Sequence, residues 1–146
     1  MRFLLAAILV FASMTISGQT LVSWNSFAQV TFHQQYSETF GFEVNVKPPE
    51  FSKELMAFNG KEIKVKGYVI PVDVELGMYM VSANAFANCF FCGNAGPETV
   101  VEIFPSSKLP RFKTDEIVTF SGILQINTQG EMNAVPYQLF QAKIVK

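Results

Sequence analysis

Residues 61–69 read Lys-Glu-Ile-Lys-Val-Lys-Gly-Tyr-Val, so apolar and polar side chains alternate along this stretch. Ile63, Val65 and Val69 fall on one side of an extended chain, and charged side chains fall on the other. This alternation predicts a β-strand with one face in a hydrophobic core and one face in water. Pro71 is expected to end the strand, because proline cannot donate a backbone hydrogen bond.

The sequence after this strand predicts four more strands, at residues 78–82, 98–104, 115–127 and 136–145. The side chains expected to point inward are Val118, Phe120, Leu124 and Ile126 in the fourth strand and Phe140, Ala142 and Ile144 in the fifth. Turns are expected at residues 72–77 and 128–131. The two prolines of residues 105–113 make a long helix in that connection unfavourable.

Five strands in this order predict an all-β fold, a five-stranded OB-like Greek-key barrel spanning residues 61–146. Two glycines support the prediction, because Gly67 and Gly122 lie near the centres of the long first and fourth strands. A glycine at such a position lets a strand bend sharply from one half of a small barrel to the other.

Residues 19–60 are expected to form an N-terminal extension with extended segments and a short helix. Ser23 can cap a helical turn, and residues 28–33 and 36–46 read as extended. Residues 49–60 predict the best helix, with Phe51, Leu55 and Phe58 on one apolar stripe and Gly60 as its left-handed end. The paired prolines at 48–49 are expected to stop any preceding strand.

Residues 1–18 read as a signal peptide, with a basic start, an apolar run from Phe3 to Ala12 and a small, polar end. The apolar run is shorter than the ~20 residues that cross a bilayer. Cleavage is expected after Gly18, or alternatively after Gln19. The mature protein is therefore predicted to be soluble, periplasmic or secreted, with no integral membrane segment.

The composition limits the function classes. The chain has 146 residues, 15 of them Phe, and a formal net charge of -1. That charge argues against a nucleic-acid partner, because proteins that bind nucleic acids usually have a basic face. The sequence contains no phosphate-binding loop or nucleophile elbow, and its single histidine is His33, so it favours a binding protein over an enzyme.

Both cysteines of the chain lie three residues apart, in the run Cys89-Phe90-Phe91-Cys92-Gly93-Asn94 with Glu98 shortly after. In an exported protein the favoured reading is a local Cys89–Cys92 disulfide that shapes a turn. A metal site of zinc or copper type, using Cys89, Cys92 and His33 or the cysteines of two chains in a dimer, is an alternative.

A redox dithiol and a pair of buried free thiols also remain open for the two cysteines. No cofactor is expected beyond such a divalent metal. Phe90, Phe91, Gly93, Asn94 and Glu98 form a candidate binding loop. Its rings either fill the core or, if exposed, mark a docking site for an unknown protein or small ligand.

The stretch Gly60–Pro71, together with Cys89-Phe90-Phe91-Cys92-Gly93 and Gly96-Pro97-Glu98, resembles a group of small exported Bacteroidetes-type proteins of unknown function. That group is similar to a broader bacterial family of periplasmic and lipoprotein domains of unknown function. The resemblance covers residues 24–145 and implies an OB-like barrel in the periplasm. Members of the broader family associated with transport systems, including metal-linked ones, imply a metal or partner role.

Overall fold

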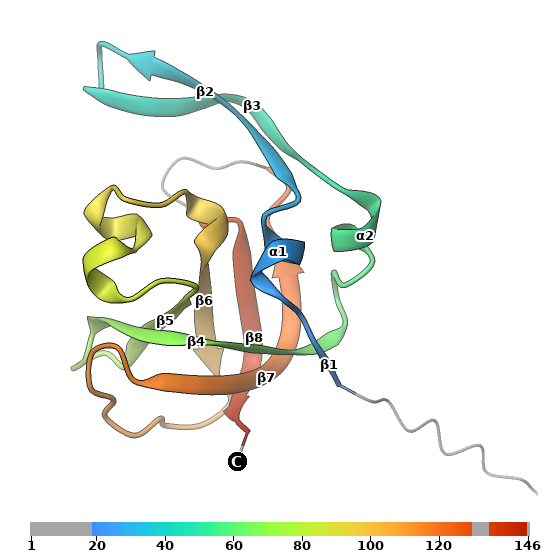
Figure 1. Ribbon diagram of the computed structural model, residues 1–146, viewed down its shortest axis with the longest axis vertical. Helices are drawn as coiled ribbons and strands as arrows, with labels where there is room; N and C mark the ends of the chain where they lie inside the picture. Colours follow the sequence, from blue (N-terminus) through green and yellow to red (C-terminus); the bar gives the residue numbers. More distant parts are fainter. Residues whose placement is uncertain (1–18, 130–134, 146) are drawn as a thin grey trace, which may run out of the picture.

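Five strands in the later part of the chain close into a barrel, and a long hairpin from the earlier part stands above it (Figure 1). The computed structural model describes residues 19–129 and 135–145. The helices and strands are β1 Thr20–Leu21, α1 Trp24–Phe27, β2 Val30–Ser37, β3 Phe42–Phe51, α2 Lys53–Met56, β4 Glu62–Asp73, β5 Met78–Ser82, β6 Val100–Pro105, β7 Ile117–Ile126 and β8 Tyr137–Ile144. Three 3-10 turns, η1 Phe86–Asn88, η2 Phe90–Cys92 and η3 Pro97–Thr99, occupy the connection from β5 to β6.

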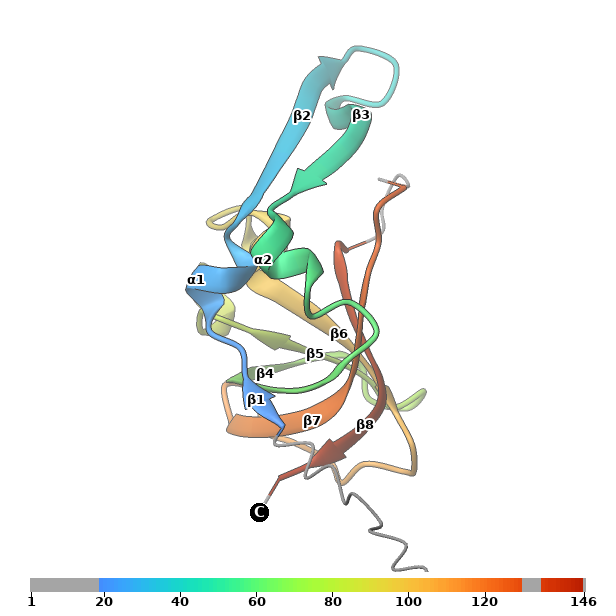
Figure 2. The ribbon, with the colours of Figure 1, turned by 90° about the vertical axis from the view of Figure 1, so that its right-hand side faces the viewer.

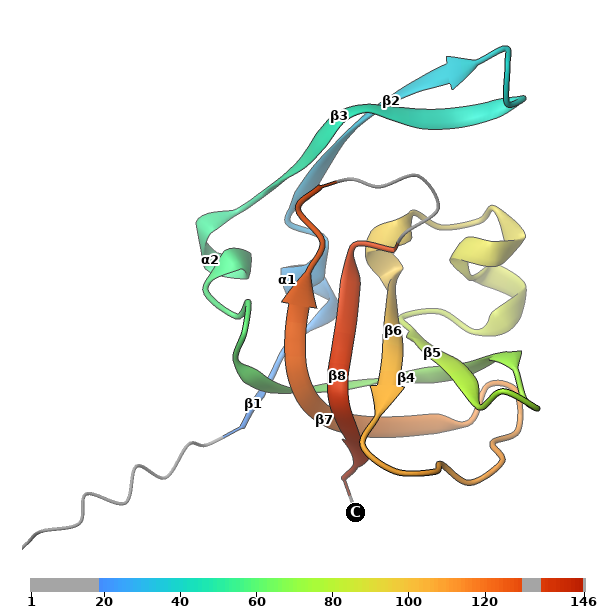
Figure 3. The ribbon, with the colours of Figure 1, turned by 180° about the vertical axis from the view of Figure 1, so that it is seen from behind.

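The strand pairing confirms the OB-like barrel. The pairs β4–β5, β5–β6, β7–β8 and β4–β7 are antiparallel, and β6 and β8 are parallel neighbours. Figure 3 shows β8 between β6 and β7, so the ring runs β4-β5-β6-β8-β7 and returns to β4. A closed ring leaves few strand edges exposed. The connection from β6 to β7 contains no helix, as its prolines predict.

The two central glycines lie where strands pass each other closely. A Cβ atom on Gly67 would stand 2.3 Å from the backbone oxygen of Ser82, and one on Gly122 would stand 2.6 Å from that of Phe140. Real Cβ atoms do not approach a backbone oxygen so closely. The barrel therefore needs glycine at both positions, as their central placement in the strands predicts.

Two predictions about the barrel strands are wrong. β4 continues through Pro71 to Asp73. On its β7 side the last backbone hydrogen bonds are those of Val69, and Pro71 faces β5 on the other side, where a strand with one free edge tolerates proline. In β8, Ala142 is buried as predicted, but Ile144 is 37% exposed and Leu139 is buried instead. The residues buried in β8 are Tyr137, Leu139 and Ala142.

A β-bulge explains why Leu139, and not Phe140, is buried in β8. Ser121 pairs with Lys143 and Ile123 with Phe140, so β8 carries one more residue than β7 over this interval. Gln141, in that interval, has a left-handed backbone with φ of 52°. The extra residue shifts the inward positions by one, which leaves Phe140 only half-buried.

The predicted helix of residues 49–60 exists, but it is shorter. β3 runs through Pro48 and Pro49 to Phe51, and the hydroxyl of Ser52 caps α2 by accepting the Leu55 N–H at 3.1 Å. The prolines do not end β3, because they lie in a bulge opposite β2. Gly60, with φ of 75°, follows the last turn as predicted.

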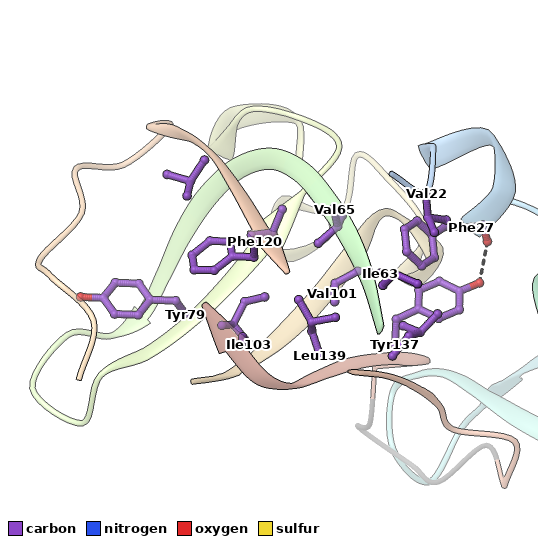
Figure 4. Packing of buried hydrophobic residues seen from close by; sticks show 14 of the residues in the cluster. Val22, Phe27, Ile63, Val65, Tyr79, Val101, Ile103, Phe120, Tyr137 and Leu139 are labelled. Carbon is purple, nitrogen blue, oxygen red and sulfur yellow. Dashed lines mark hydrogen bonds between the residues drawn. The ribbon is translucent and has the colours of Figure 1, made fainter. Parts of the chain in front are cut away.

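The N-terminal extension packs into the same core as the barrel. Ser23 caps α1 as predicted, and β1 pairs in parallel with the start of β4. The Tyr137 hydroxyl of β8 donates a hydrogen bond of 2.5 Å to the Phe27 carbonyl of α1 (Figure 4). Phe27 and Leu55 are fully buried beside the barrel side chains. The boundary placed at residue 60 remains a prediction.

β2 and β3 form a separate two-stranded sheet, which we call the β2–β3 arm (Figure 2). The arm turns at Gly41, which has φ of 73°. At its base, Ser52 donates its N–H to the Gln29 carbonyl at 3.0 Å and its hydroxyl to the Gln29 side-chain oxygen at 2.7 Å. The two ends of the arm are therefore held together where they join the barrel.

The predicted signal peptide of residues 1–18 lies outside the described residues, as does part of the predicted turn at 128–131. In the described ranges, no helix is long and apolar enough to cross a bilayer.

Candidate functional site

The cysteine loop connects β5 to β6 at one end of the barrel. Cys89 precedes η2 and is fully buried, whereas Cys92 ends η2 and is exposed. Gly93, with φ of 73°, ends the turn. The loop is held from outside by Asp115, whose carboxylate accepts the Phe86 N–H at 2.6 Å.

Asp115 lies in the exposed turn that precedes β7. Its backbone is left-handed, with φ of 64°, and its N–H donates to the Val69 carbonyl at 3.2 Å. Such a backbone conformation costs ~1–3 kcal/mol in a residue other than glycine. The bond to Phe86 offsets part of that cost and ties the cysteine loop to the start of β7.

The structure does not support the predicted Cys89–Cys92 disulfide, since both cysteines are free in it. The Cys92 thiol instead donates to the Phe86 carbonyl at 3.1 Å. Desolvation and then the neighbouring Cys89 thiol raise the pKa of Cys92 above its ordinary value. A raised pKa lowers the thiolate fraction of Cys92, which slows its reactions as a nucleophile.

The metal site predicted from Cys89, Cys92 and His33 is not assembled. His33 lies in the β2–β3 arm, where its Nε2 is 3.0 Å from Glu50 Oε1. The hydrogen bond from Lys47, at 3.2 Å, and then the one from His33 lower the pKa of Glu50. Within residues 19–129 and 135–145, no three side chains of His, Cys, Asp or Glu gather where they could hold a metal ion.

The candidate binding loop exposes one of its two central rings. Phe91 is 48% exposed, and Phe90 is half-buried and packs edge-on against it, with ring centroids 5.4 Å apart. Asn94 donates to the Ala87 carbonyl at 3.0 Å, so its side chain shapes the loop. Glu98 is half-buried near Tyr137. The binding role of the loop stays a prediction.

A groove that the sequence analysis missed opens at the opposite end of β5 and β6. It has a volume of about 220 Å³ and is lined by the β4–β5 turn and the ends of the two strands, including Val72, Leu76, Met78, Glu102, Phe104 and Pro105. The ladder between β5 and β6 ends at the pair Tyr79–Ile103. Beyond that pair the strands separate, and the groove lies where they part.

The walls of the groove are apolar and unusually exposed. Leu76 is 75% exposed, Val72 47% and Met78 42%. On the opposite wall, Phe104 stacks on Phe140, with ring centroids 4.6 Å apart and planes 8° from parallel. Exposed apolar side chains gathered around a concavity mark an interaction site, whereas single exposed ones do not.

One carboxylate gives the groove its polarity. Of the described residues that line the groove, Glu102 alone is charged. The Glu102 carboxylate accepts a hydrogen bond from the Gln138 side-chain amide at 3.3 Å, which leaves acceptor capacity for a further donor. A ligand for this groove would thus combine apolar surface with a cationic or hydrogen-bond-donating group.

The sequence does carry a signal for this groove. Val72, Val74 and Leu76 place apolar side chains in a stretch that otherwise reads as a polar turn. All three are exposed. Apolar residues in a predicted turn contradict the rule that turns are polar, and that contradiction points to a contact surface.

Comparison with known proteins finds a solved structure that is similar to this chain. No protein-family model matches the chain, and no curated protein matches its sequence. The chain is similar to the crystal structure of a DUF3299 family protein from Pseudomonas aeruginosa PAO1, with 16% identity and a TM-score of 0.46. The match covers 67% of this chain and 68% of that one.

Proposed function

We propose that this protein is an exported binding module that holds an extended, apolar peptide segment with a basic side chain in the groove between β5 and β6. The observation that carries the proposal is the gathering of exposed apolar side chains around a concavity with one carboxylate. Export rests on the signal-like character of residues 1–18 and on the resemblance to exported proteins.

The chemistry of the walls supports an extended peptide. Among the described residues, β5 on its β6 side and β6 on its β5 side have no strand partner beyond Tyr79 and Ile103, so a ligand backbone can lie between the separated ends. Apolar ligand side chains would bury Leu76 and Met78. A lysine or arginine would reach the Glu102 carboxylate and form a charge-assisted hydrogen bond.

The groove can be tested by selecting displayed random peptides on the protein purified from the periplasm. We expect the selected peptides to be apolar with one lysine or arginine. Because a hydrogen bond between charged groups contributes ~1.5–3 kcal/mol, Glu102→Gln should weaken a selected peptide about tenfold or more. Leu76→Ser should weaken it as well, whereas Leu21→Ser, which changes a residue 59% exposed in β1, should not.

Two results would contradict this function. One is a set of selected peptides that binds Leu76→Ser and Glu102→Gln as tightly as the parent protein. The other is a selection without any cationic residue. The mass of the protein recovered from the periplasm tests export in the same preparation, because cleavage after Gly18 leaves Gln19 as the first residue.

A further inference from the structure

The two edges of the β2–β3 arm differ in how they resist pairing with another strand. Edge strands are normally protected by charges, prolines and bulges. In the arm, all of these features belong to β3. It carries Glu43, Lys47 and Glu50, and both of its prolines, Pro48 and Pro49.

The bulges also belong to β3. Thr31 pairs with Glu50 and His33 with Lys47, so β3 has one extra residue over this interval. His33 and Gln34 are adjacent in β2, but their partners Lys47 and Asn45 are two residues apart, so β3 has a second extra residue. β2 itself runs without an inserted residue, and its outer edge is the regular one.

β2 has none of the protective features of β3. It reads Val-Thr-Phe-His-Gln-Gln-Tyr-Ser, eight residues without a proline, a glycine, an acid, a lysine or an arginine. Among the described residues, β2 pairs only with β3, so its other edge is open. Tyr36, near its end, is 61% exposed. β-Branched and aromatic residues favour the extended conformation that an added strand would need.

We propose that β2 pairs antiparallel with the β2 strand of a second copy of this chain, which joins the two arms into one four-stranded sheet. An isolated two-stranded hairpin is only marginally stable in water, and a sheet of three or more strands is more stable. The inference concerns the arm and does not depend on the groove in the barrel.

The charge pattern of β2 suits antiparallel pairing with a second copy of the same strand. In a two-fold antiparallel pair, the central residues of a strand lie opposite or diagonal to the same residues of its copy. A charge at the centre would therefore meet a like charge, and self-pairing requires a neutral strand. The centre of β2 is His33, Gln34 and Gln35, and the only ionisable side chain among them, His33, is already engaged by Glu50.

The test is the molar mass of the purified protein as a function of concentration, by sedimentation equilibrium. The variant Gln34→Lys with Gln35→Lys places like charges at the centre of the pair, and both positions are exposed. We expect the parent protein to dimerise and the variant to dimerise at least about tenfold more weakly. The control, Glu43→Gln with Val46→Lys, adds the same net charge on exposed positions of β3 and should leave the dimer unchanged.

A mixture of two variants with opposite charges distinguishes charge repulsion in the dimer from a folding defect in the variants. Gln34→Glu with Gln35→Glu should also be monomeric alone, and an equal mixture of the lysine and glutamate variants should form a heterodimer. A parent protein that stays monomeric, a control that dissociates as much as the β2 variant, or a mixture that does not associate would each overturn the inference.

Discussion

Tyr137 joins the barrel to the N-terminal extension through one buried hydrogen bond, and replacing it with phenylalanine tests that junction. The hydroxyl donates to the Phe27 carbonyl at 2.5 Å, and both residues are fully buried. Tyr137→Phe keeps the ring, whose centroid lies 4.8 Å from that of Phe27, and removes only the donor. A buried carbonyl left without its partner costs ~1–3 kcal/mol, so we expect the free energy of unfolding to fall by that amount.

Trp24 makes the measurement specific to the junction. It is the only tryptophan, and its ring centroid is 5.3 Å from that of Phe27. Urea unfolding followed by its fluorescence reports the extension, and circular dichroism reports the strands. The matched control is Tyr79→Phe, because the Tyr79 ring is equally buried but its hydroxyl points out of the core (Figure 4). The reasoning is refuted if the two substitutions destabilise the protein equally.

The same tyrosine gives a pH dependence. Burial, and then the charge of Glu98, raise the pKa of Tyr137 above the ordinary value of 10.0. A raised folded-state pKa means that the stabilisation is fully present below pH 10.0 and is lost as the pH rises further. Tyr137→Phe should therefore lose less stability than the parent between neutral and strongly alkaline pH. An equal loss in both proteins would show that another group is responsible.

Two further predictions concern the barrel and the cysteine loop. Gly67→Ala should destabilise the fold by at least ~2 kcal/mol in urea unfolding, because its Cβ would stand 2.3 Å from the Ser82 carbonyl oxygen. Gly77→Ala, with open space around it and φ of 70°, should cost only ~1 kcal/mol, and an equal cost would refute the close packing. In alkylation followed by mass spectrometry, exposed Cys92 should react before buried Cys89, slowly at neutral pH and faster as the pH rises. A protein that takes up no label until it is reduced would contradict the free thiols.

The sequence predicted the barrel well, because alternation along a strand is a local property. The residues of β4 and β7 by themselves predict which side chains point inward, and the central position of Gly67 predicts the close approach of another strand there. The bulge at Gln141 could not be predicted this way. An inserted residue reverses the alternation after it, and only the pairing with β7 reveals the insertion. The start of α2 was misplaced for a similar reason, because the pairing of β3 with β2 keeps Pro49 in a strand.

The candidate site was harder to predict, because it depends on contacts between distant segments. The cysteines were placed correctly in a loop. The state of the Cys92 thiol, however, depends on the Phe86 carbonyl, which accepts a hydrogen bond from it. His33 could be judged only once the arm was seen to place it beside Glu50. The groove is formed by the β4–β5 turn and the far end of β6. The sequence of neither segment indicates that the two lie side by side.

The bonds between Gln29 and Ser52 have a consequence for how this protein can vary. Because they hold the two ends of the arm together at the barrel surface, the chain between them is in effect an insertion into a shorter loop. Residues 31–50 can lengthen, shorten or change composition without moving the ends that the barrel requires. A family built on this barrel is therefore free to exchange the arm while its core packing stays the same.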